Sequence, residues 1–130
     1  MEKLFRYFVA TSILLTIAYW LIPYVDISWL PEDELRLLQA DGYKALIPRH
    51  PAIYWGLFFV WIFTLIGLLF FKKIARTAYF SLFVLMTLAE PFFGYLVLSP
   101  IEAMIDNILA VAQGAILAMA YLTTVGARFK

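Results

Sequence analysis

Four long apolar segments follow one another along the chain, and few charged residues interrupt them. They cover about residues 4–22, 52–71, 77–98 and 100–123. A helix of about 20 apolar residues is long enough to cross the roughly 30 Å of hydrocarbon in a bilayer. The pattern therefore predicts an all-α integral membrane protein with four transmembrane helices in a small bundle. The whole chain, 1–130, is expected to form this single membrane domain.

The polar segment of about residues 25–51 separates the first two predicted spans. Its stretch PEDELRLLQADG favours a short amphipathic helix, because Pro31 suits the first helical position and three acids follow it at the positive N-terminal end. Gly42 suits the C-terminal end of this helix. We expect the helix to lie along the outer membrane surface or against the bundle. The next stretch, GYKALIPRHP, is expected to be extended because Pro48 and Pro51 disfavour helix before them.

The short stretch SPIE lies between the third and fourth predicted spans. Ser99 as N-cap, Pro100 at the first helical position and Glu102 at the third match a capping box. A ligand-binding role for Glu102 is the alternative to this capping role. A capping box here predicts a tight turn, so the segments 77–98 and 100–123 are expected to form an antiparallel hairpin.

Basic residues gather on one side of the four predicted spans. They precede the first span, separate the second from the third and follow the fourth: Lys3, Arg6, Lys72, Lys73, Arg76, Arg128 and Lys130. Loops rich in lysine and arginine stay in the cytoplasm. We therefore expect a bacterial-type inner-membrane protein with both termini in the cytoplasm and the segment 25–51 outside.

Composition supports a lipid environment and excludes several kinds of chemistry. Hydrophobic residues make up 65% of the chain and charged residues 15%, whereas a soluble domain is about half apolar and a quarter charged. The chain has no cysteine and one histidine, which excludes disulfides, thiolate catalysis, iron–sulfur clusters and multi-histidine metal sites within one chain. A net charge of +1 gives no reason to expect nucleic acid as a partner. We expect no cofactor and no catalytic activity.

Acids inside the apolar segments are the main candidates for chemistry. If the hairpin turn centres on Ser99 and Pro100, Glu90 lies near the middle of the membrane, opposite Asp106, Asn107 and Gln113. No lysine, arginine or histidine lies at this depth, and a charged carboxylate there costs at least about 2.5 kcal/mol. Three alternatives follow: the acids are neutral and hydrogen-bonded to one another or to the amides, they line a wet cavity, or a partner brings a cation. The neutral, structural acid is the expectation for Glu90.

Pro91 follows Glu90 directly and lacks the N–H that would bond to the carbonyl of Thr87. We expect the third span to bend at this point. The side chains of Thr87 and Glu90 are near enough to satisfy the loosened backbone.

Small residues recur every four positions in the fourth span, at Ala110, Gly114 and Ala118. Such spacing lets another helix approach closely. The expected neighbour is a helix of the same bundle, and a second copy of the chain is the alternative.

Function is expected to be non-catalytic binding of another membrane or periplasmic protein, as an accessory subunit or an immunity-type protector. The predicted recognition surface is the outer loop, with the charged residues Glu32, Asp33, Glu34, Arg36 and Asp41. The alternative is a small ion channel or proton-coupled transporter that uses Glu90 and Asp106. An intramembrane enzyme with the same two acids ranks third.

Overall fold

The computed structural model describes residues 1–47 and 50–130, and regular structure over these ranges is entirely helical. The helices are α1 (Glu2–Trp29), α2 (Glu32–Leu38), α3 (Pro51–Leu69), α4 (Lys73–Ala89) and α5 (Pro100–Leu122). Two short 3-10 helices, η1 (Glu90–Phe93) and η2 (Thr124–Arg128), follow α4 and α5. The expected all-helical class is confirmed. Pro48 and Arg49, part of the stretch expected to be extended, lie outside the described residues.

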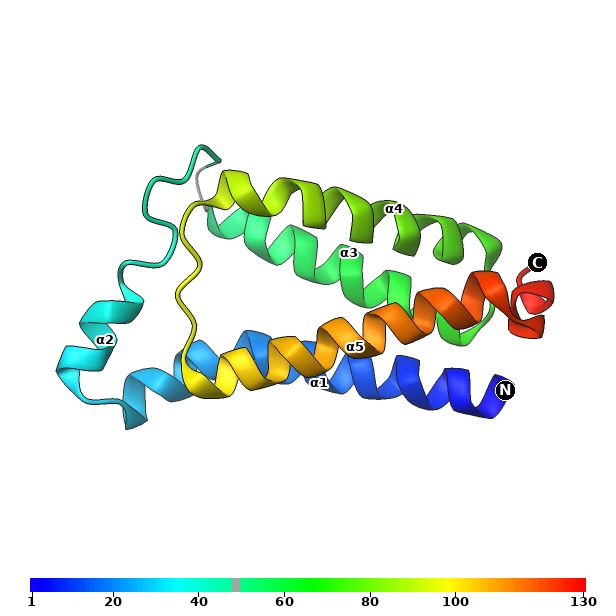
Figure 1. Cartoon of the computed structure of the whole chain (residues 1–130), viewed down its shortest axis with the longest axis horizontal. Coiled ribbons are helices and arrows are strands. Elements are labelled where there is room, and N and C mark those ends of the chain that lie inside the picture. Colours follow the sequence, from blue (N-terminus) through cyan, green and yellow to red (C-terminus); the bar gives the residue numbers. More distant parts are fainter. Residues whose placement is uncertain (48–49) are drawn as a thin grey trace.

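The four long helices form two antiparallel pairs that lie side by side (Figure 1). One pair is α1 with α5 and the other is α3 with α4, while α1 also packs against α3. Both termini and the α3–α4 turn lie at one end of the bundle, which we call the inner end. Helix α2 and the segment that joins η1 to α5 lie at the opposite, outer end (Figure 1).

Three helices, α1, α3 and α5, are long and apolar enough to cross a membrane. The outward surface of the bundle carries large exposed apolar side chains on every long helix, such as Leu14, Phe63, Leu88 and Val111. Apolar surface of this extent requires a lipid or protein environment. Helix α4 has 17 residues and is the shortest of the four.

A compact aromatic core closes the inner end. The ring of Phe5 packs at 5.6 Å from Phe71 and 5.8 Å from Phe129, measured between centroids. The guanidinium of Arg76 lies over the ring of Phe129 and donates a hydrogen bond from Nη1 to the carbonyl of Gly126, at 3.0 Å. These contacts fasten the C-terminal segment to the start of α4.

The expected third span of 77–98 ends much earlier than its apolar pattern suggests. Helix α4 stops at Ala89, and the chain leaves η1 through Gly94, which has φ 84° and ψ −161°. Pro91 cannot continue the helical hydrogen bonds, and glycine readily adopts this backbone conformation. Pro91 therefore ends a helix instead of bending one. The hydroxyl of Thr87 donates to the carbonyl of Phe83, at 2.9 Å.

An irregular, non-helical segment, 94–99, replaces the expected tight turn before α5. It crosses the outer end from the α3–α4 pair to the α1–α5 pair (Figure 1). Helix α5 consequently packs mainly against α1, and α4 pairs with α3. The hairpin expected between 77–98 and 100–123 is not formed as a tight turn.

Helix α1 is longer than expected and continues past Pro23 to Trp29. Ile22 packs with Ile105 and Leu109 of α5, and this packing holds the helix through the proline. As a result Asp26, which the sequence pattern assigned to the outer loop, is a buried residue of α1.

The part of the outer loop that follows α2 is hydrogen-bonded to the segment that follows α4. Gly42 N donates to Tyr95 O at 2.7 Å, and Tyr95 N donates to Tyr43 O at 3.0 Å. Leu46 N donates to Phe92 O at 2.9 Å. The loop is therefore an ordered cover over the outer end.

The small residues Ala110, Gly114 and Ala118 all face outward and are exposed. A Cβ added to Gly114 would meet nothing within 4 Å. The buried face of α5 instead carries larger residues, including Ile105, Leu109 and Ile116. The expected intramolecular seam is not formed, because those larger side chains make the contact with α1.

Candidate functional site

Polar residues form a stripe along α1 that sequence reasoning overlooked. Ser12, Thr16, Tyr19 and Asp26 recur at intervals of four, three and seven residues, which places them on one helical face. Ser12, Thr16 and Asp26 are buried, and Tyr19 is half-buried. This stripe was missed because the first span was expected to end before Asp26. With a longer first helix, the spacing of these residues would have revealed it.

A matching stripe lies on α5, and here the residues were expected to share a face. Glu102, Asp106 and Gln113 are four and seven residues apart. Because α1 and α5 form the closest helix pair, the two polar stripes meet inside the bundle. The result is a polar seam in the outer part of an otherwise apolar molecule.

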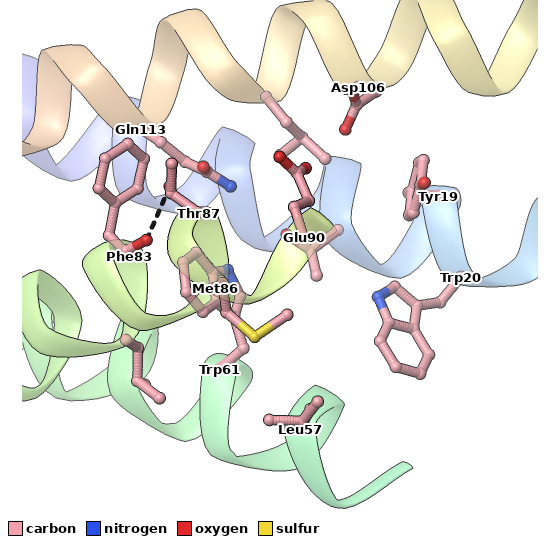
Figure 2. A pocket seen from close by; sticks show the side chains of 13 residues that line it. Tyr19, Trp20, Leu57, Trp61, Phe83, Met86, Thr87, Glu90, Asp106 and Gln113 are labelled. Carbon is pink, nitrogen blue, oxygen red and sulfur yellow. Dashed lines mark hydrogen bonds between the residues drawn. The ribbon is translucent and has the colours of Figure 1, made fainter. Parts of the chain in front are cut away.

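A cavity of about 230 Å³ opens where this seam meets α3 and α4. Its polar lining comes from three helices and η1: Thr16, Tyr19, Thr87, Glu90, Asp106 and Gln113. Figure 2 shows the carboxyl groups of Glu90 and Asp106 pointing into the same space, with the amide of Gln113 beside them. The structure thus brings together three of the four residues expected to form an intramembrane cluster. We call this space the central cavity.

The two carboxyl groups of the central cavity have no described cationic neighbour. No lysine, arginine or histidine occurs among the described residues that line it. Both acids are exposed to the cavity, and within residues 1–47 and 50–130 neither carboxyl makes a hydrogen bond. The hydrogen bonds expected between Glu90 and the polar groups of α5 are not formed among the described residues, where Glu90 begins η1 directly after α4 ends.

Asn107, the fourth expected member of the cluster, faces away from the cavity. Its side-chain amide donates to the carbonyl of Ala103 at 2.8 Å. It lines a separate apolar groove together with Leu4 and Tyr7 of α1. Its position one residue after Asp106 turns it about 100° around α5, which takes it off the polar stripe.

Aromatic rings form the apolar wall of the central cavity. Trp20, Trp61 and Phe83 line it from α1, α3 and α4 (Figure 2). The Trp20 ring is packed 3.7 Å from the Tyr54 ring and 4.8 Å from the Phe58 ring, measured between centroids. The rings next to the carboxylates are therefore held in place by neighbouring aromatic residues.

The capping box at the start of α5 is present. Ser99 Oγ accepts from Glu102 N at 3.3 Å, and Glu102 Oε2 accepts from Ser99 N at 2.8 Å. Pro100 occupies the first turn. Glu102 therefore holds the helix N-terminus and also places a carboxylate at the outer end of the polar seam.

The charged residues of the outer loop fall into two groups. Glu32, Asp33, Glu34 and Arg36 are exposed on α2. Asp41 instead turns inward, where its Oδ1 accepts from the N–H of Val97 at 3.0 Å. Over the described parts of the chain, no group of three acidic, histidine or cysteine residues is arranged to hold a metal ion.

Comparison with known proteins gives no independent guide to the function. No protein-family model, no curated protein and no solved structure matches the chain.

Proposed function

We propose that this chain is a small proton-coupled membrane transporter that binds a small cation in the central cavity. The observation that carries this proposal is the convergence of Glu90 and Asp106 on one cavity that has no described cationic side chain. Two carboxylates in apolar surroundings are costly unless protons or a bound cation neutralise them. The site can therefore exchange protons for a cation, and the proposed role involves no covalent chemistry.

The other lining groups suit a cation with an organic part. Trp20, Trp61 and Tyr19 offer aromatic faces, which attract a nearby positive charge. Gln113 and Thr16 add hydrogen-bonding groups to the lining. A polar cavity of this size also holds water, which provides a path for protons.

The proposed membrane arrangement has four spans. Three are α1, α3 and α5, and α4 together with η1 forms the additional one. The combined length of α4 and η1 is roughly 33 Å from the rise per residue of each helix type, which matches the hydrocarbon thickness. Exposed apolar residues of α4, such as Phe80, Leu85 and Leu88, then face lipid. We place both termini in the cytoplasm of a bacterial-type inner membrane, since the seven basic residues named above flank the inner end.

Proton movement in proteoliposomes tests this function. A pH-sensitive dye inside the vesicles reports protons that leave when an organic quaternary ammonium ion is added outside and enters in exchange. Glu90→Gln and Asp106→Asn should abolish the signal, because neither amide titrates, while Glu90→Asp should retain part of it. Glu34→Gln on α2 is the matched control. Full activity in both amide variants would disprove the proposal.

Recognition of another protein by α2 is the second proposed function. Glu32, Asp33 and Glu34 are exposed together on this helix, and the loop that carries them is held by hydrogen bonds to the 92–97 segment. An ordered acidic surface suits a basic partner surface. Replacing the three acids by lysine should leave membrane insertion intact and remove any protein that copurifies from native membranes. A partner retained at full yield by this variant would rule out α2 as the contact.

A further inference from the structure

A second pocket, of about 420 Å³, lies at the outer end between α1, α2 and the start of α5. Its walls are partly apolar, with Leu35 and Leu38 of α2 facing Val97. Three carboxylates, those of Asp26, Asp41 and Glu102, also line it. We call this space the outer pocket.

Asp26 is the residue that makes the outer pocket unusual. The residue is 5% exposed, and its Oδ2 atom is buried with no hydrogen-bond partner within the described parts of the chain. A buried carboxylate oxygen without a donor costs free energy that a folded protein ordinarily avoids. Asp26 is therefore a buried carboxylate whose Oδ2 receives no hydrogen bond from the described residues.

The neighbouring acids add negative charge but already hold backbone groups. Glu102 accepts from Ser99 N, and Asp41 accepts from Val97 N. Among the described residues that line the outer pocket there is no lysine, arginine or histidine. A positively charged donor would therefore gain from all three carboxylates, and most from Asp26.

We propose that the outer pocket binds the ammonium group of a small organic cation, with Asp26 as its principal counter-charge. An ammonium group offers three hydrogen-bond donors, and one of them pairs with the Asp26 carboxylate. The leucine and valine walls accommodate an apolar body attached to that group. The described acids are not arranged for a metal ion, which favours an organic cation over a bare ion.

A third pocket lies between the outer pocket and the central cavity and shares lining residues with both. It has a volume of about 350 Å³, shares Asp41 and Glu102 with the outer pocket, and shares Tyr19 and Trp20 with the central cavity. The outer pocket is thus the first binding site on a carboxylate-lined route from the outer end. This route rests on the proposed transport function, whereas the outer site itself does not.

Equilibrium binding to the purified full-length protein in detergent tests the outer site. The probe is dansylcadaverine, which has a free primary ammonium and a fluorescent apolar group, and the neutral analogue N-butyl dansylamide measures apolar binding alone. Asp26→Asn should weaken probe binding about ten- to hundredfold and leave the neutral analogue unchanged, because a charge-assisted hydrogen bond is lost. Glu2→Gln, an acid at the inner end that does not line the outer pocket, is the matched control.

Two further variants keep the result interpretable. Leu38→Trp should fill the outer pocket and weaken probe binding while Asp26 remains intact. The same Asp26→Asn change is also made in a protein that carries Glu90→Gln and Asp106→Asn. The unfolding temperature of each variant is first compared with that of the natural protein. If Asp26→Asn lowers the unfolding temperature, Leu38→Trp becomes the deciding variant.

Each outcome separates the outer site from the proposed function. A loss with Asp26→Asn in both backgrounds supports the outer site. Unchanged affinity with Asp26→Asn and with Leu38→Trp overturns it, even if the central variants abolish binding. If Asp26→Asn weakens binding but the central variants have no effect on binding or proton movement, the outer site stands and the transport proposal fails.

Discussion

Gly94 decides how the chain leaves α4. Its backbone has φ 84° and ψ −161°, a region that residues with a side chain rarely adopt. The loop backbone also approaches closely, because an added Cβ would lie 2.5 Å from Tyr43 O and 2.8 Å from Ala45 N. This one residue therefore allows both the change of direction and the hydrogen bonds between the outer loop and the 92–97 segment.

Gly94→Ala is expected to destabilise the protein by about 1–3 kcal/mol, because it combines backbone strain with a steric clash. The measurement is the thermal unfolding midpoint of the purified protein in detergent. Gly114→Ala is the control, since Gly114 is helical and a Cβ there meets no neighbour. Equal midpoints for the two variants would contradict the role given to Gly94.

Helices α3 and α4 approach each other closely near their connecting turn. A Cβ on Gly67 would lie 2.6 Å from the Cβ of Ala75, which is inside contact distance. Phe71 in the turn has φ 52°, and Lys72 N donates to Gly67 O at 3.1 Å. Small residues on both helices therefore set the spacing of this pair.

Gly67→Ala should lower stability by about 1–3 kcal/mol through overpacking. Ala75→Gly in the same chain should recover part of the loss, because it removes the methyl group that clashes. The comparison uses the unfolding midpoints of the single and double variants. Gly56→Ala on the same helix is the control, since a Cβ there meets nothing within 4 Å. An unchanged midpoint for Gly67→Ala would show that the helices can separate at no cost.

The two ends of the molecule differ in charge and in structure. The inner end has both termini, the α3–α4 turn and the aromatic core, with Arg6 over the ring of Phe71. The outer end has α2 and the carboxylates of the outer pocket. From this polarity we propose one orientation in a membrane, with the acid-lined end outside.

Single-cysteine labelling in intact cells tests this orientation, and the sequence is suited to it because it contains no cysteine. Glu34→Cys on α2 should react with a membrane-impermeant maleimide added outside. Ala127→Cys in η2 should react only after the cells are broken open. Both positions are exposed, so access to the thiol decides the result. The reverse labelling pattern would show that the molecule is oriented the other way.

Local patterns determined the helices and their capping, because the residues involved are close in sequence. The apolar segment 52–71 corresponds to α3, and the box of Ser99 and Glu102 begins α5. Helix boundaries that depend on distant contacts were missed. Pro23 lies inside α1, where the adjacent Ile22 packs on α5, and after Pro91 ends α4 the chain turns at Gly94 because Gly94 is held against the outer loop.

The candidate sites show the same division. The helical periodicity of the sequence in α5 was enough to place Asp106 and Gln113 on one face. The absence of a basic residue near Glu90 was also readable from the sequence. Which helix faced that stripe was not readable, because apolar helices of similar length can pair in several ways. In the tertiary structure the polar stripe of α5 packs against α1. Asp26 is buried with no described donor to its Oδ2, and Glu90 lies on η1, where it lines the same cavity as Asp106. Helix formation follows from hydrogen bonds within a segment, whereas a cavity exists only where side chains of several segments fail to fill the space between them.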